Sequence, residues 1–598
     1  MKKILILPIL LSACAATPQR PLEFNTMIAH WANYANEDYL HFVKEARPEL
    51  AQIGFYGAHY WSLAHTKHGG GYPAHFPKVG LKENRDWLRQ RNRDLHKLDT
   101  MVVGHFNIEF LVGDPKSDKG PRGFFKFYQD LWDEKLLGPK PIDDPLQLLE
   151  KNADGTPRVS KNYSIGGMRE YWACLNNPHW RDVLKAWVRH GIAQGLDGFM
   201  INYFYRHNCL CDHCQDSFRK YLGSRFTATE LKSKFKIDML AEHKFTEIGA
   251  WHNPAESTPF KREQLRFSQI ATKECFDEVF VKYGRSLKPG LIVGQWNHLG
   301  NFNQISGDER CLLPAELWAK DEDYLWYSTG GSAFYTDIKN GFLGEGTLQA
   351  RYIRGATGNK PFTLGKYEST RTRVSIAELA ANGGAPMGFY TRFTVPEARR
   401  VITQYYRFIR GHSAIYRHNQ SHAEAVLLFP RKAVHAGNVD AVAKFRETGN
   451  ALLNRHVLFD ILPDDLASPE RLAAYQKVFR PGDEAATVKT RVTAPKTVRV
   501  SASQPAKANA LHLHFVNYNR TEPEKPKSAG RGIQDEKPIA VEGIKCLIPL
   551  PEGKALKEIR FLTPEDDTAS VSFKVNDGKA IFTVPKFLVY AVVELAWE

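Results

Sequence analysis

The stretch Trp180–Asn202, WRDVLKAWVRHGIAQGLDGFMIN, contains one complete helix-and-strand unit. Trp180–Gln194 has the apolar spacing of an amphipathic helix, and Gly198–Asn202 is apolar on both faces, as a strand buried between helices should be. The same succession recurs along the chain. The strand-like runs are Met27–Trp31, Ile53–Tyr56, Met101–Phe106, Gly198–Asn202, Leu291–Trp296, Tyr324–Ser328, Phe362–Lys366 and Met387–Tyr390. Eight runs, each followed by a helical pattern, predict an α/β fold with a (β/α)8 TIM barrel rather than an open sheet.

The order of these patterns divides the chain. The barrel is expected over residues 22–418, with long insertions after its third and fourth strands, near residues 110–175 and 203–265. Insertions at the carboxyl ends of barrel strands are where binding sites form. Residues 422–482 alternate strand and helix patterns and predict a small α/β domain. From residue 483 to 598, short alternating runs separated by Pro, Gly and Lys predict a C-terminal antiparallel β-sandwich.

Composition agrees with a multidomain globular protein. The 598 residues exceed the roughly 250–300 that one hydrophobic core accommodates. Apolar residues make up 43% and charged residues 25%, which excludes a mainly disordered, fibrous or multi-span membrane protein. The net charge of +15 favours acidic partners. The sequence has no phosphate-binding glycine loop, no Gly-x-Ser-x-Gly elbow and no His-Glu-x-x-His helix, so esterase and zinc-protease chemistry have no support.

The N-terminus predicts export. A short basic stretch precedes an apolar run, Ile4–Leu11, that is too short to span a bilayer, and small residues follow. Residues 1–14 are therefore interpreted as a signal peptide. Leu11-Ser12-Ala13-Cys14 resembles the bacterial lipobox, in which the cysteine is lipidated; the alternative is a plain cleaved signal with an incidental Cys14. Ala15 favours the outer membrane of a Gram-negative cell, on its periplasmic or surface face. Nucleic acid is not an expected partner of an exported lipoprotein.

Four cysteines have metal-binding spacing. Cys209, Cys211 and Cys214 lie within six residues, and Cys174 lies upstream at the head of a helix. Four thiolates satisfy tetrahedral zinc, and a closed four-sulfur shell is structural rather than catalytic. The alternatives are unpaired buried thiols, a disulfide such as Cys174–Cys209, or His213 as the fourth ligand.

The segment Cys174-Leu-Asn-Asn-Pro-His-Trp-Arg181, a helix, a strand and then Cys209-x-Cys211-x-x-Cys214 resemble the zinc-bearing region of the glycoside hydrolase family 42 β-galactosidases. The resemblance implies a retaining glycosidase. It also implies that Ala425–Gly482 corresponds to a truncated flavodoxin-like trimerisation domain, and that the tail is the small C-terminal β domain of that family. Because the trimerisation-like domain is shortened, we expect a monomer or a dimer.

The resemblance breaks at the catalytic acid. The family carries Asn-Glu at the end of strand four, whereas this chain carries Asn202-Tyr203. The nucleophile of the clan is a glutamate near the end of strand seven, which favours Glu368; its alternative role is a salt bridge to a nearby arginine. Glu109, after strand three, is the candidate acid/base, and its alternative role is capping the insertion. A retaining mechanism requires two carboxyl groups about 5–5.5 Å apart.

Polar and aromatic residues gather at the predicted strand ends. Aromatic faces pack on sugar CH groups, while amides and imidazoles bond to hydroxyls, so such a rim suits a carbohydrate. The predicted substrate-binding residues are Trp31, His59, Tyr60, His105, Asn107, Asn202, Tyr203, Arg206, Trp296, Asn297, His298 and Lys366. Arg206, Lys366, Arg371, Arg373 and Arg392 favour an anionic glycan, unless they pair with acids such as Glu378. The chain is expected to be a glycoside hydrolase, or a carbohydrate-binding pseudo-enzyme that lost its acid.

Overall fold

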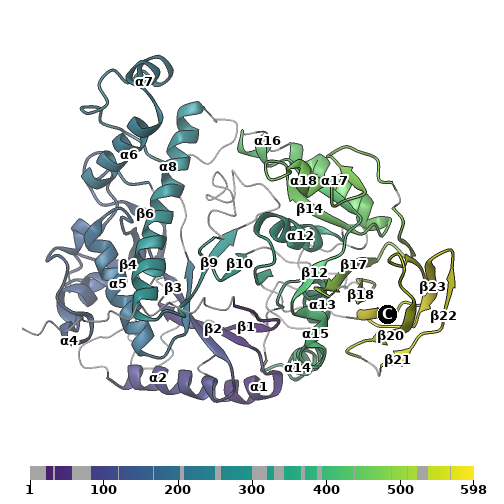
Figure 1. Cartoon of the computed structure of the whole chain (residues 1–598). Coiled ribbons are helices and arrows are strands. Elements are labelled where there is room, and N and C mark those ends of the chain that lie inside the picture. The colour runs from purple at the N-terminus through teal and green to yellow at the C-terminus, as the bar shows by residue number, and fades with distance from the viewer. Residues whose placement is uncertain are drawn as a thin grey trace, which may run out of the picture.

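The computed structural model (Figure 1) describes most of the chain. The described residues are 22–30, 34, 36–56, 82–118, 120–165, 167–202, 208–249, 258–298, 320–328, 338, 343–364, 371–386, 393–436, 438, 440–486, 488–507, 509–521, 537–565 and 568–598.

Seven parallel strands form a curled sheet in which spatial order follows chain order (Figure 1). The strands are β1 (Met27–His30), β2 (Leu50–Tyr56), β3 (Met101–Asn107), β8 (Gly198–Asn202), β9 (Ile292–His298), β10 (Tyr324–Ser328) and β11 (Phe362–Leu364). They coincide with seven of the eight predicted runs. The eighth run, Met387–Tyr390, lies outside the described residues.

The segment before that eighth run reaches both edges of the sheet. The Ala385 N–H donates to the Phe362 carbonyl at 2.7 Å, and the Met27 N–H donates to the Pro386 carbonyl at 3.1 Å. The Tyr406 hydroxyl donates to the carbonyls of both Met27 and Pro386. Ala385 and Pro386 therefore lie between β11 and β1.

Helices cover the outer face of the curled sheet (Figure 1). They are α1 (Tyr39–Ala46), α2 (Lys82–His96), α5 (Pro178–Ala193), α8 (Pro259–Phe276), α9 (Arg285–Leu287), α12 (Glu345–Thr357), α13 (Thr372–Ala381), α14 (Pro396–Gly411) and α15 (Ser413–Tyr416), and a π-helix, Asp277–Gly284, continues α8. The side chain of Asn177 caps α5 by accepting from the His179 N–H, and Pro178 fits the first turn. No helix among the described residues combines the length and the apolar composition that a membrane span requires.

Close packing between neighbouring strands depends on one glycine. Gly198 pairs with Ile292 at the start of β8, and a Cβ at this position would lie 1.9 Å from the Ile292 carbonyl oxygen. Real Cβ atoms do not approach backbone oxygen so closely, so the β8–β9 pairing requires glycine here.

The insertion after β3 forms its own antiparallel sheet. Its strands are β4 (Phe110–Asp114), β5 (Arg122–Gly123), β6 (Val159–Ile165) and β7 (Met168–Trp172), in the order β5-β4-β7-β6, with short helices α3 (Phe124–Lys126), α4 (Glu134–Leu137), a π-helix at Phe127–Leu131 and a 3-10 helix at Pro145–Leu148. After β8, helices α6 (Asp212–Arg225) and α7 (Ala228–Phe235) pack on α8 through a separate core that includes Phe218, Leu222 and Phe267.

The next unit contains a small parallel sheet. Its strands are β13 (Ala425–Phe429), β14 (Phe459–Pro463) and β15 (Lys477–Phe479), and its helices are α16 (Arg431–His435), α17 (Ala441–Asn454) and α18 (Pro469–Leu472). Its core is continuous with that of α12 and β11 of the barrel, through residues such as Leu348, Phe362, Leu427 and Phe445.

The C-terminal part contains two antiparallel sheets. The six-stranded sheet has the order β12-β17-β18-β24-β20-β21 and the four-stranded sheet the order β16-β19-β23-β22. The strands are β12 (Asn419–Ser421), β16 (Arg491–Thr493), β17 (Val498–Pro505), β18 (Ala510–Asn517), β19 (Ile544–Pro549), β20 (Leu556–Leu562), β21 (Ala569–Ser570), β22 (Phe573–Asn576), β23 (Lys579–Val584) and β24 (Tyr590–Trp597). Phe515 of one sheet and Phe582 of the other belong to the same buried cluster.

Candidate active site and metal centre

The carboxyl ends of β3 and β8 bring together three polar side chains that the sequence predicted. Asn107 and Asn202 are direct partners in the parallel register. The Asn202 side-chain amide lies 2.9 Å from Nε2 of His105, and all three residues are buried. Because side chains alternate along a strand, His105 and Asn107 share the inner face of the sheet with Val103.

Two indole rings continue this layer across β9 and β10. Trp296 and Trp326 are register partners with ring centroids 4.1 Å apart, and the His105 ring lies 5.7 Å from Trp296. Both indoles belong to the inner-face cluster that also contains Met200 and Tyr324. The layer therefore combines imidazole and amide groups with flat aromatic surfaces, the chemistry that sugar recognition uses.

Asn107 carries an open donor at this end of the sheet. Its Oδ1 accepts from the N–H groups of Glu109 and Phe110, at 3.2 and 3.0 Å, which fixes the turn that follows β3. Its buried Nδ2 has no hydrogen-bond partner among the described residues. A buried amide donor without a partner costs free energy, so a ligand hydroxyl or carbonyl at this point would be favoured.

Glu109 is held in place by its backbone. The Ala173 N–H donates to its carbonyl at 2.7 Å, and the Trp180 Nε1–H donates to the preceding carbonyl of Ile108 at 2.9 Å. The side chain is 2% exposed. Burial raises the pKa of Cys275 on α8 to about 12, with the nearby Glu109 carboxylate among the further causes. Glu109 therefore lies where β3, α5 and α8 converge.

Some of the predicted site residues do not join this layer, and others lie outside the described residues. Asn297 alternates with Trp296 along β9, so its side chain lies on the opposite face, where its Nδ2 donates to the Gln295 carbonyl at 3.1 Å. The side chain of His298 is outside the described part of β9. Trp31, His59, Tyr60, Tyr203, Arg206, Lys366, Glu368 and Cys14 also fall outside the described residues.

One member of the layer was missed by the sequence reasoning. Trp326 faces the inner cluster, whereas its neighbour Tyr327 packs in the core next to the small parallel sheet. The spacing of two between Tyr324 and Trp326 was the available signal, because residues two apart share a face of a strand.

Of the arginines expected at the barrel mouth, Arg371 and Arg373 are described. Both are buried at the start of α13, and Arg373 lies 3.4 Å from the Glu397 carboxylate. Glu378, the acid named as an alternative partner, accepts hydrogen bonds from Tyr518 and Thr347.

The four predicted cysteines meet at one point. Their sulfur atoms all lie within 4.8 Å of one another, with Cys174 Sγ 3.5 Å from Cys214 Sγ and 3.7 Å from Cys211 Sγ. Tetrahedral zinc with Zn–S bonds of about 2.3 Å places its sulfurs about 3.8 Å apart, so the arrangement fits this ion. Cys174, Cys209 and Cys214 are buried and Cys211 is partly exposed.

Backbone and amide donors surround these sulfurs. The N–H groups of Lys151 and Cys211 donate to Cys209 Sγ at 3.3 and 3.4 Å, and Asn176 Nδ2 donates to Cys214 Sγ at 3.5 Å. Hydrogen bonds from Cys174 and the other two thiols hold the pKa of Cys211 well below its ordinary value, whereas burial raises the pKa of Cys174. Donors to sulfur favour thiolate, the form that binds metal.

Comparisons with known proteins agree with this chemistry. The chain is 25% identical over 254 residues to the β-galactosidase BgaA of a Thermus species and, over the same length, to a β-galactosidase of Thermus thermophilus. Each alignment covers 39% of this chain and 38% of the relative, so the chain matches well under half the length of these enzymes. No protein-family profile matches.

A solved structure resembles nearly the whole chain. The α-L-fucosidase isoenzyme 2 from Paenibacillus thiaminolyticus has a TM-score of 0.60 and 13% identity, with 96% of this chain and 100% of that chain covered. At this identity the likeness concerns the fold. The chain thus resembles this fucosidase in fold and, over part of its length, the β-galactosidases in sequence.

Proposed function

We propose that the protein is an exported glycoside hydrolase acting on an oligosaccharide or polysaccharide. The observation that carries the proposal is the buried layer at the carboxyl ends of β3, β8 and β9, in which His105 bonds to Asn202 beside the open donor of Asn107. Active sites of parallel barrels form at this end of the strands. The similarity to β-galactosidases supports the reaction class.

The proposed mechanism is retaining. Glu368 attacks the anomeric carbon and Glu109 protonates the leaving oxygen, then activates the water that releases the sugar. Asn107 and Asn202 bind sugar hydroxyls, and the His105–Asn202 bond fixes the orientation of that amide. Trp296 supplies an apolar surface for the ring. The role of Glu368 rests on its place after the seventh strand.

A second candidate function is carbohydrate binding without turnover. Tyr203 follows Asn202 where the resembled family has its acid/base glutamate, and a tyrosine of ordinary pKa is a poor proton donor to a glycosidic oxygen. In this case the same layer holds a glycan, and the chain is a pseudo-enzyme.

Aryl glycosides separate the two functions. Their leaving groups need little protonation, so the hydrolase should cleave them, and Glu368→Gln should abolish cleavage. Glu109→Gln should slow natural substrates far more than aryl ones if Glu109 is the acid. Cleavage of neither substrate class, together with measurable oligosaccharide binding, would establish the pseudo-enzyme instead.

We also propose that the four cysteines bind one structural zinc ion. A site closed by four sulfurs has no open position for water or substrate, so the ion would stabilise the insertion without entering the reaction. Cys174 belongs to the segment after β7, and the other three precede or begin α6, so the metal would join two segments that meet only in the folded chain.

Lipid attachment at Cys14 and an anionic substrate complete the proposal. Cys14→Ser should release the protein from the membrane fraction and block incorporation of labelled palmitate. The net charge of +15 supports a sulfated or uronic glycan, which should bind more tightly than its neutral counterpart in a manner that weakens with salt. We propose a monomer or dimer, to be measured by light scattering.

A further inference from the structure

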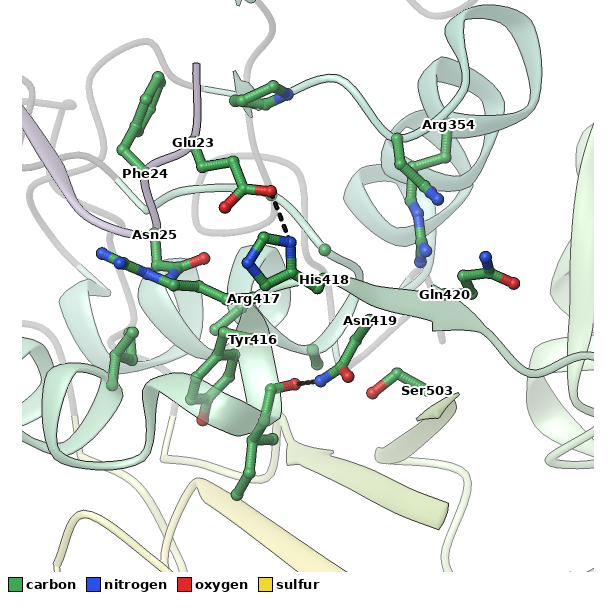
Figure 2. A pocket seen from close by; sticks show the side chains of 18 of the residues that line it. Glu23, Phe24, Asn25, Arg354, Tyr416, Arg417, His418, Asn419, Gln420 and Ser503 are labelled. Atoms are coloured by element: carbon green, nitrogen blue, oxygen red, sulfur yellow. Dashed lines mark hydrogen bonds and ion pairs between the residues drawn. The ribbon is translucent and has the colours of Figure 1, made fainter. Parts of the chain in front are cut away.

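A cavity of about 310 Å³ lies at the opposite end of the strands from the candidate active site (Figure 2). It is lined by the residues that precede β1, including Glu23 and Asn25, by those that precede β11, and by the loop after α13. The segment Tyr416–Gln420 and two residues of the C-terminal sheet, Ser503 and His514, close its other side. The cavity is therefore built by the barrel, the connecting segment and the C-terminal sheet together.

Arg354 brings a charge to this cavity. Figure 2 shows its side chain extending from α12 toward the segment that carries Asn419 and Gln420. Among the described residues its guanidinium has no carboxylate within ion-pair distance, and its one hydrogen bond goes to the Asn382 carbonyl at 3.4 Å. A guanidinium has five N–H donors, so most of this capacity remains for a ligand.

The carboxylate that acts on Arg354 electrostatically, Asp460, has hydrogen-bond partners of its own. Asp460 accepts from the Ser421 hydroxyl at 2.7 Å and from the Tyr475 hydroxyl at 3.0 Å. Asp460 acts on Arg354 by electrostatic attraction, without a hydrogen bond between them. Burial lowers the pKa of Arg354 from its ordinary value. Gly383, with φ +80°, lies beside the guanidinium, and a Cβ there would come within 3.1 Å of its carbon. The backbone thus leaves room for the arginine at this position.

The other charges around the cavity are balanced. Glu23 Oε1 lies 2.8 Å from Nδ1 of His418, the contact drawn in Figure 2, and Arg417 pairs with Glu49. Lys360 donates to the carbonyls of Lys320 and Glu322, near the acids at 321–323. The guanidinium of Arg354 is the positive charge that these described pairs leave facing the cavity.

The rest of the wall suits a sugar rather than a bare ion. Asn25, Asn359, Gln420 and Ser503 offer neutral hydrogen-bonding groups, and Phe24 and Tyr416 offer aromatic surface. The volume stands at the lower end of the range for small-molecule sites, roughly 300–1,000 Å³, and far exceeds what an inorganic anion fills.

We infer that this cavity is a second binding site, which takes one sugar unit bearing a carboxylate or sulfate group. The acidic group bonds to Arg354, and the hydroxyls bond to the amides of Asn25 and Gln420. The ligand class rests on the proposed carbohydrate activity, whereas the site itself is independent of turnover. A chain that binds an acidic glycan here is held to the polymer while the active site at the other end works.

Calorimetry on the full mature chain tests the inference, with glucuronate, glucose and sodium sulfate as probes. Glucuronate should bind at least about tenfold more tightly than either other probe. Arg354→Gln should weaken glucuronate binding by about ten- to a hundredfold, the effect of losing a hydrogen bond to a charged group. Arg471→Gln is the matched control, since Arg471 bonds to the neighbouring Gly355 carbonyl but does not line the cavity, and it should bind as the parent does.

Gln420→Ala tests the sugar contact with an exposed residue whose loss leaves the fold intact. It should weaken glucuronate binding a few-fold and leave sulfate binding unchanged. Equal affinity for all three probes, sulfate binding as tight as glucuronate binding, or glucuronate binding unaffected in Arg354→Gln would each overturn the inference. Failure to hydrolyse any glycoside would refute the proposed activity and leave these binding results standing.

Discussion

Replacement of Cys214 by serine tests the metal centre most sharply. Cys214 lies in the first turn of α6, and its sulfur is 3.5 Å from that of Cys174. Because the sulfurs of a tetrahedral zinc site lie about 3.8 Å apart, this pair needs to move by only a few tenths of an ångström to bind the ion. Loss of one thiolate should therefore remove a preformed site and reduce the zinc content from about one ion per chain to well below half.

The effect on stability should be local. The helices α6 and α7 keep their own core through Phe218 and Leu222, so the whole insertion should not unfold. At a free zinc concentration a hundred times the dissociation constant, the ion stabilises the segment it holds by about 2.7 kcal/mol. Amide hydrogen exchange at residues 208–217 should then accelerate by about a hundredfold in the variant, while exchange around Leu222 changes little.

Metal analysis and hydrogen exchange measured by mass spectrometry provide the assay, because one melting temperature is poorly defined for several domains. Cys546→Ala is the control, since Cys546 is a buried thiol in the distant strand β19. Wild-type protein without zinc and with a mapped Cys174–Cys209 disulfide would refute the reasoning, as would unchanged exchange at 208–217.

Three other predictions follow from particular contacts. Asn202→Ala removes the amide bonded to His105, and kcat/KM for an aryl glycoside should fall by about ten- to a hundredfold; a change below twofold would place the reaction elsewhere. Burial lowers the pKa of His514 to about 3, so the unfolded chain binds a proton that the folded chain does not as the pH falls from about 6.5 toward 3. Stability should drop by about 1.4 kcal/mol per pH unit in this window, and acid unfolding followed by circular dichroism should shift to lower pH in His514→Gln; an unshifted midpoint contradicts this. Gly198→Ala should lower the free energy of unfolding by about 3 kcal/mol or more, because the new Cβ meets the Ile292 carbonyl oxygen. Gly411→Ala, whose Cβ would have nothing within 4 Å, should leave stability nearly unchanged. Resistance to proteolysis compares the two variants.

The parallel sheet was accessible from sequence because each of its strands is a short apolar run bounded by turn residues. Gly198–Asn202 has the same limits in the structure as in the prediction, since both of its faces are buried and the pattern has no polar interruption. The antiparallel sheet of the first insertion was not predicted. Its strands β4 and β7 pair although 53 residues lie between Asp114, the end of β4, and Met168, the start of β7, a contact that local patterns do not encode.

The candidate site shows the same division. The cysteine cluster was predictable because three cysteines so close in sequence have the spacing of metal ligands. Asn297 and Trp326 show what a list of strand-end residues misses, since a shift of one position moves a side chain to the opposite face of the sheet. The cavity around Arg354 is formed by segments from three parts of the chain, so no local sequence pattern could predict it.

Strand β12 has a consequence for how the chain can be divided. This short strand follows the last barrel helix, yet Ser421 pairs with Ser503 of β17 in the C-terminal sheet. The small parallel sheet is thus inserted in the sequence between two strands that pair with each other. An engineer who cuts at residue 422 or 482 would strip an edge strand from the C-terminal sheet, whereas excising the unit as a cassette and joining its flanks with a short linker keeps that edge paired.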